Sequence, residues 1–152
     1  MAIFDAGYEL YDDATLVAAT TTDYVGATCK TIDWQQADLE MGQGTPLYLN
    51  IRVGTTAYVG GTNVNFILTA DTAAAGHDGS SAVVWQSGDR AVSTLSAGTW
   101  IYRGALPLDV DTARYLALGV IGDGATTAGT IDAWIDHGPQ SSYDTQVTTS
   151  NI

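Results

Sequence analysis

The sequence predicts an all-β protein, an antiparallel β-sandwich in a single domain. Apolar residues alternate strictly with polar ones in several short segments, which is the pattern of half-buried strands. Turn residues separate these segments at the spacing typical of sandwiches. No stretch shows sustained helical periodicity, and no repeat of roughly 20 to 50 residues is present. At 152 residues the chain is long enough for one well-buried core.

Three segments assign the faces of the predicted sheets. Apolar residues take every second position of 47–53, 64–70 and 131–135, so one face of each strand is core and the other is polar or aromatic. Ile67 and Trp134 depart from this rule, because each lies on the face opposite the apolar one. Either both faces of these strands are covered or the two side chains face a partner chain. With the low content of charged residues, this favours an associating sandwich.

Turn signals divide the whole chain into seven or eight strands. Residues 1–22 are expected to form an extended N-terminal arm with one short strand at 8–11 and a turn at 12–13. Residues 23–138 form the sandwich, with strands 46–53 and 63–71 joined as a hairpin through Gly60 and Gly61. Residues 41–44 and 109–111 are expected to be loops. Residues 139–152 are expected to be a polar tail. The remaining predicted strands are 24–34, 82–86, 99–103, 115–121 and 130–137.

Charge and composition narrow the classes of partner. Seventeen acidic residues stand against five basic ones, which gives a formal net charge of −12, and Lys30 is the only lysine. A nucleic-acid partner is therefore not expected, because phosphate binding needs clustered positive charge. The N-terminus lacks the pattern of a signal peptide, and no apolar run is long enough for a membrane span. We expect a soluble protein made in the cytosol, with Cys29 as a small buried side chain.

Residues for catalysis or metal binding are sparse. His77 and His137 are the only histidines, too few for the metal site of a cupin-like barrel. Asp132 and Asp136 share a strand face but lie roughly 13 Å apart by the rise per residue, too far for a glycosidase pair. With Trp134 between them, they could instead form a sugar-stacking surface. Calcium binding in the 109–111 or Asp123 loop stays open. We expect no enzyme, no cofactor and no resident metal.

Three strand segments, taken together, resemble the capsid cement, or decoration, proteins of tailed bacteriophages. They are residues 39–53 (LEMGQGTPLYLNIRV), 113–120 (ARYLALGV) and 129–135 (GTIDAWI), in the order found in that family. The likeness covers roughly residues 5–137. It implies a jelly-roll sandwich that forms a dimer or trimer on the outside of an icosahedral head. There it would clamp neighbouring major capsid subunits, with no catalysis.

The resemblance raises the question of which residues touch the shell. We expect the arm, residues 2–13, to dock on the capsid or on a neighbouring copy, because its apolar residues lie outside the predicted sandwich and need cover. Deleting it should then leave the fold intact. A carbohydrate- or receptor-binding sandwich module is the alternative function. The expected interface residues are Ile3, Phe4, Tyr8, Leu10, Tyr11, Ile67 and Trp134.

Overall fold

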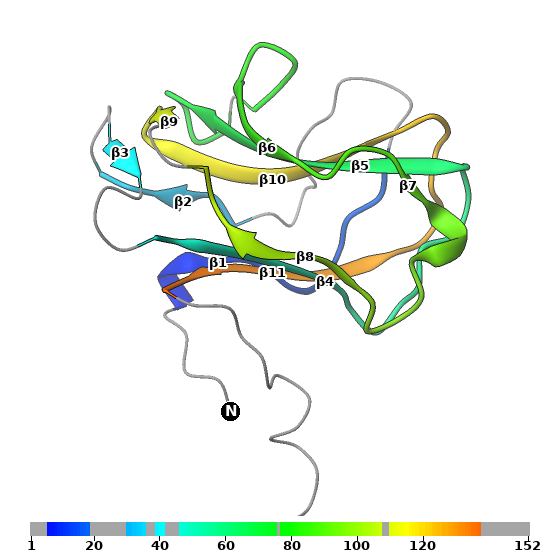
Figure 1. Ribbon diagram of the computed structural model, residues 1–152. Helices are drawn as coiled ribbons and strands as arrows, with labels where there is room; N and C mark the ends of the chain where they lie inside the picture. Colours follow the sequence, from blue (N-terminus) through cyan, green and yellow to red (C-terminus); the bar gives the residue numbers. More distant parts are fainter. Residues whose placement is uncertain are drawn as a thin grey trace, which may run out of the picture.

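Two antiparallel sheets pack face to face in the computed structural model, which describes residues 6–18, 30–35, 39–41, 46–75, 77–107 and 110–137 (Figure 1). Sheet A has the strand order β1-β11-β4-β8, and sheet B has the order β2-β10-β5-β6, with β7 also paired to β5. The elements are η1 (Ala6–Tyr8), β1 (Glu9–Thr15), β2 (Ile32–Asp33), β3 (Leu39–Met41), β4 (Tyr48–Val53), β5 (Asn63–Asp71), β6 (Ala82–Gln86), β7 (Arg90–Ala91), η2 (Val92–Thr94), β8 (Trp100–Ala105), β9 (Val110–Thr112), β10 (Tyr115–Gly122) and β11 (Thr130–Asp136).

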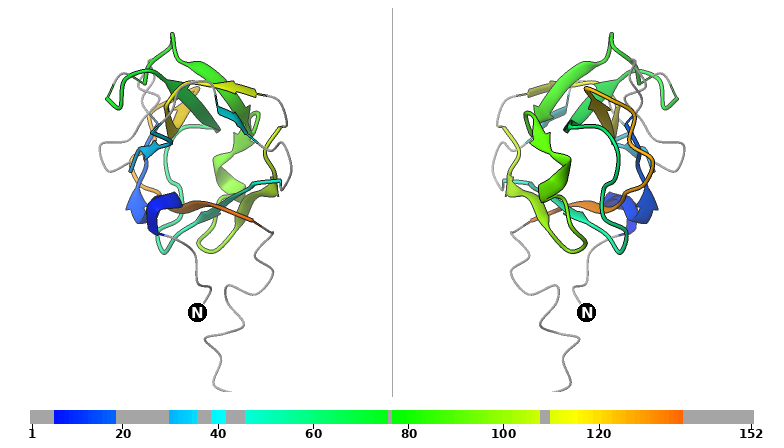
Figure 2. Two further views of the ribbon diagram at one scale, coloured as in Figure 1. Left: turned by 90° about the vertical axis from the view of Figure 1, so that its left-hand side faces the viewer. Right: turned by 90° about the vertical axis from the view of Figure 1, so that its right-hand side faces the viewer.

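The alternating segments form the centre of both sheets, as their periodicity predicts. The strands expected at 63–71 and 82–86 have the bounds of β5 and β6, and β4, β10 and β11 lie where alternation places them. Their inward-facing residues meet between the sheets and are almost completely buried. The end-on views of Figure 2 show the two sheets around this core. The innermost side chains include Leu49, Ile51, Phe66, Leu68, Leu116, Leu118 and Ile131.

Strand connections give the sandwich a jelly-roll topology. The chain passes from sheet A to sheet B between β1 and β2, between β4 and β5 and between β8 and β10, and it returns to sheet A at β4, β8 and β11. The predicted hairpin of residues 46–53 with 63–71 is therefore wrong. β4 pairs with β11 and β8, whereas β5 pairs with β10, β6 and β7. A turn signal marks a change of direction but does not say whether the chain stays in the same sheet.

The segment predicted to be an arm contributes the edge strand β1 to sheet A. β1 pairs with β11 from Glu9 opposite Trp134 to Thr15 opposite Thr130, with two register shifts between them. The shifts turn consecutive residues Leu10 and Tyr11 into the core, where they are 0% and 1% exposed. The Tyr11 hydroxyl donates a hydrogen bond of 2.8 Å to the carbonyl of Leu118 in sheet B. The first strand thus ties the two sheets together.

Other loop predictions also need correction. Leu39–Met41 and Val110–Thr112 form the short ribbon β3–β9, so Met41 and Val110 belong to strands. Asp12 and Asp13 lie within the irregular part of β1 and make no turn between elements. The structure describes residues 30–34 of the strand predicted at 24–34, and of these only the two residues of β2 form a strand. The predicted tail, residues 139–152, lies outside the described residues. No helix in the described ranges is long and apolar enough to cross a membrane.

Candidate interaction surfaces

One end of the sandwich, which we call the loop end, presents two exposed valines on hydrogen-bonded backbone. It comprises residues 16–18, 58–62, 91–93 and 123–129. Val17 is 41% exposed and Val59 is 54% exposed. The Val59 N–H donates to the Ala128 carbonyl at 3.1 Å, and the Val59 carbonyl accepts from the Thr127 N–H at 2.7 Å. The Ala18 N–H donates to the Thr126 hydroxyl at 2.7 Å. These bonds hold both valines against the same segment.

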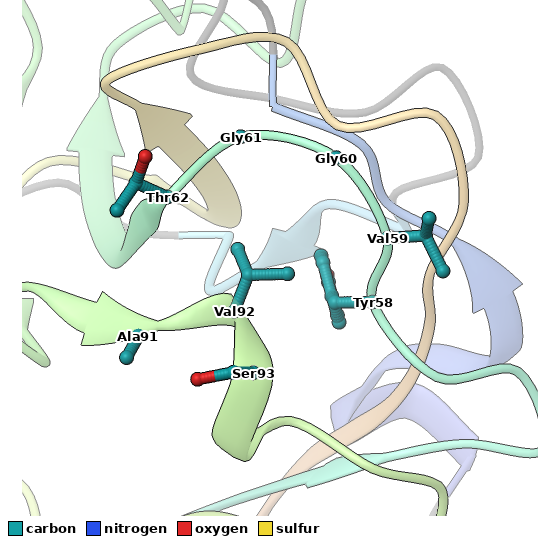
Figure 3. A pocket seen from close by; sticks show the side chains of 8 residues that line it. All are labelled: Tyr58, Val59, Gly60, Gly61, Thr62, Ala91, Val92 and Ser93. Atoms are coloured by element: carbon teal, nitrogen blue, oxygen red, sulfur yellow. The ribbon is translucent and has the colours of Figure 1, made fainter.

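A recess of about 430 Å³ lies beside Val59 at the loop end (Figure 3). Its lining consists of the 58–62 connection on one side and the start of η2 on the other, and Tyr58 and Val92 point toward each other across it. Gly60 and Gly61 have φ values of 86° and 70°, and a Cβ on either would lie within about 3 Å of the 124–127 backbone. Glycine is therefore required where this wall packs against the neighbouring loop.

The chemistry of the recess is uncharged. Its lining side chains carry no ionisable group except the phenol of Tyr58, whose pKa is raised by burial. That hydroxyl donates a hydrogen bond of 2.7 Å to the Leu16 carbonyl, and the ring packs edge-on against Phe66. Tyr58 therefore has a structural role. The recess therefore presents apolar and hydroxyl groups without charge.

The outer face of sheet A carries an ionic network. Arg52 and Asp132 form an ion pair of 2.7 Å with side chains only 12% and 9% exposed. The other Asp132 oxygen accepts the Asp13 N–H at 2.7 Å. The Asp13 carboxylate in turn accepts the Thr55 hydroxyl and N–H and the Thr130 hydroxyl, each at 2.7 Å, and these bonds hold its pKa below the usual value. The network locks the second register shift of β1, where Asp13 has a φ of 42°.

The expected arm contacts divide into three groups. Ile3 and Phe4 lie outside the described residues. Tyr8 is half-buried, and its ring lies 5.6 Å from that of Trp34. Leu10 and Tyr11 are core residues, so the prediction that they face a partner is wrong. The sequence reasoning failed here because the shifts in β1 break the strict alternation that marks a strand.

Ile67 and Trp134 lie on outer sheet faces, as alternation predicted, but neither is available to a partner. They are 3% and 1% exposed within the single chain. The Trp134 ring packs edge-on against Trp100 at 5.9 Å. Of the two explanations offered for their pattern, cover within the chain is the one that holds. The predicted stacking surface of Asp132, Trp134 and Asp136 also fails, because a sugar cannot reach a buried indole and Asp132 is 6% exposed.

Several ionisable side chains elsewhere in the described residues stabilise loops or lie alone. In the part of the chain that the structure describes, no three His, Cys, Asp or Glu side chains gather as metal ligands. Asp123 accepts the N–H groups of Thr62 and Asn63 at 3.0 and 2.9 Å, which ties two connections together and lowers its pKa. His137 is exposed at the end of β11, whereas His77 is buried. Cys29 lies outside the described residues.

The profile of the Bbp16 family matches residues 13–135, about four fifths of the chain. The chain belongs to the Bbp16 family. The Bbp16 match begins within β1 and ends within β11, so it includes part or all of every strand in both sheets. It also includes the whole loop end, with Val17, Val59 and the recess. A search of curated proteins found no match.

Proposed function

We propose that this chain is a capsid cement protein that binds the outer surface of an icosahedral phage head and clamps neighbouring major capsid subunits. The observation that carries the proposal is the resemblance of residues 39–53, 113–120 and 129–135 to cement proteins, in the same order along the chain. These segments supply β3 and β4, β10 and β11. The resemblance therefore concerns the central strands of both sheets, which set the shape of the domain.

The physical requirement for a cement protein is modest. It must bind the assembled lattice more tightly than the free subunits, because only that difference stabilises the shell. Copies that each make weak contacts can supply it through multivalency. A rigid sandwich suits the task, since little conformational entropy is lost when its surface docks.

The loop end is the surface that we assign to the shell. Its exposed apolar side chains, Val17 and Val59, stand on hydrogen-bonded backbone, and the adjoining recess can accept a side chain from the partner. Carbohydrate binding has less support, because Trp134, the indole at the centre of the expected stacking surface, is buried. No membrane or nucleic-acid partner enters the proposal.

Co-sedimentation with bare capsids tests both the function and the surface. The full-length protein should pellet with the shells and raise their resistance to bursting. Val59→Asp should weaken the binding of each copy to the shell about tenfold. The substitution loses about 1 kcal/mol of free energy from burying the valine side chain, and a carboxylate must also be desolvated. Val83→Asp is the matched control: Val83 is 52% exposed but lies on β6, away from the loop end.

The two parts of the proposal can fail separately. If the unmodified protein does not pellet with shells at any concentration, the cement function is wrong. If it pellets and Val59→Asp binds as tightly as Val83→Asp, the function stands and the assignment of the loop end is wrong. Gel filtration of the free protein would then show whether it is an oligomer, because linked copies would raise the affinity for the shell without the loop end.

A further inference from the structure

The structure describes the connection between β5 and β6 at residues 72–75 and 77–81, and the side chain of His77 docks it on the outer face of sheet B; the Thr31 hydroxyl also donates to the Ala74 carbonyl at 3.2 Å. In this connection, residues 72–75 and 78–80 are exposed, whereas His77 is 9% exposed. The His77 Nδ1 atom lies 2.8 Å from the hydroxyl oxygen of Thr69, which is fully buried in β5. Figure 1 shows this connection on the side of sheet B that faces away from sheet A.

The residues around His77 form a small buried patch outside the main core. Thr69 pairs with Ala117 of β10, and Ile67 pairs with Gly119 one pleat further along. Ile67 and Ala117 are 3% and 0% exposed, yet they point away from the core between the sheets. The imidazole is therefore bonded to the one hydroxyl of a buried, otherwise apolar part of this face.

The hydrogen bonds favour a neutral ring with the proton on Nδ1. The Thr69 hydroxyl can donate to the Ala117 carbonyl, at 3.3 Å, and accept from Nδ1–H. The Nε2 atom is buried and has no hydrogen-bond partner among the described residues. Adding a proton there would create a buried cationic N–H with no acceptor, which is costly unless the ring moves into water.

The charged groups near the ring do not supply that acceptor. Asp71, at the end of β5, accepts the Ser81 hydroxyl at 2.6 Å and the Ala73 N–H at 3.0 Å, and Asp78 accepts the Ser80 hydroxyl and N–H. Both carboxylates favour the charged ring, but burial outweighs them and lowers the pKa of His77. Of the residues described on β10 and β6, this face presents Tyr115, beside Asp71, and uncharged Val83 opposite Thr69.

We propose that residues 72–81 form a proton-sensitive latch, which is closed when His77 is neutral and opens locally when His77 is protonated. Opening withdraws the imidazole from Thr69 and exposes the strip of Ile67, Ala117 and Gly119, while the hydrogen-bonded sheets stay intact. The sign follows from linkage: the released histidine binds a proton more readily than the docked one. Docking is therefore strongest above about pH 6.5 and weakens as the pH falls, by up to about tenfold per pH unit. The latch is independent of shell binding.

Amide hydrogen exchange measured by NMR at about pH 7.5 and about pH 5 tests the latch, with rates corrected for intrinsic exchange. In the unmodified protein, protection of residues 72–75 and 77–81 should fall at least tenfold at the lower pH, while the amides of Thr69, β4 and β11 stay protected. His77→Asn can keep a hydrogen bond to Thr69 but cannot titrate, so its loop protection should not change with pH. His137→Asn, at the exposed histidine, should behave as the unmodified protein does.

Two results of the exchange measurement would overturn the latch. One is equal loop protection at both pH values in the unmodified protein. The other is loss of protection in β4 and β11 together with the loop, because opening would then be global. Long-range ¹H–¹⁵N correlation of the imidazole gives a direct check, since the closed state requires a neutral ring with the proton on Nδ1. A ring protonated on both nitrogens at about pH 7.5 would also refute the proposal.

Discussion

Replacing Tyr11 tests whether the first strand is part of the fold or an attached arm. Tyr11 is 1% exposed between the sheets, and its hydroxyl donates to the Leu118 carbonyl at 2.8 Å. Tyr11→Phe keeps the ring and removes one buried hydrogen bond, which should cost about 1 kcal/mol. Tyr11→Ala also removes the ring and leaves a cavity, so the expected cost is about 4 kcal/mol.

The larger loss would be a substantial part of the total stability. A domain of this size typically has a free energy of unfolding of about 5–15 kcal/mol, and each kcal/mol shifts the melting temperature by about 2–4 °C. Tyr11→Ala should therefore melt about 8–16 °C lower than the unmodified protein. Removing residues 1–13 deletes most of β1 and should prevent stable folding, contrary to the expectation from the sequence that the arm is dispensable.

Urea and thermal unfolding, followed by tryptophan fluorescence and circular dichroism, measure these changes. Asp12→Ala is the control on the same strand, because Asp12 is exposed and should change stability by less than about 0.5 kcal/mol. If Tyr11→Ala unfolds within about 0.5 kcal/mol of the unmodified protein, β1 does not tie the sheets together and the reasoning fails.

Two further predictions concern the ionic groups of the sheets and loops. Asp132→Ala leaves Arg52 nearly buried without its carboxylate and should cost about 3 kcal/mol in urea unfolding; a loss below about 1 kcal/mol would contradict the role of the pair. Asp13 and Asp123 have lowered pKa values in the folded state, chiefly through hydrogen bonds from Thr55 and Asn63, so the unfolded chain takes up protons first. The contribution of these carboxylates to the free energy of unfolding should be fully present above about pH 4 and should be lost toward about pH 2. The loss should be shallower in Asp13→Asn, and an acid unfolding curve identical to that of the unmodified protein would disprove this.

Alternation was enough to find the strands that carry the core. In β4, β5 and β11 every second side chain is apolar, and a chain with that period must place one face in the core if it forms a sheet. The outward direction of Ile67 and Trp134 followed from the same rule. What covers those faces did not, because cover comes from segments distant in the sequence.

Irregular and surface features escaped prediction for a different reason. Asp13 adopts a positive φ in a register shift of β1, and its stabilising partners, Thr55 and Thr130, are 42 and 117 residues away. Val17 and Val59 have no alternating neighbours to distinguish them, and only the tertiary arrangement sets them on the same exposed end. No local pattern could have linked His77 to Thr69, although the two are only eight residues apart.

The sequence by itself determined the fold class, the position of the main strands and the side of each strand that is apolar, because these depend on the two-residue period of an extended chain. The tertiary structure alone decided that β4 and β5 belong to different sheets, that Tyr11 is core and that Trp134 is covered. Those outcomes depend on pairing between segments that are far apart in the chain, and pairing energy is settled by the whole set of strands together.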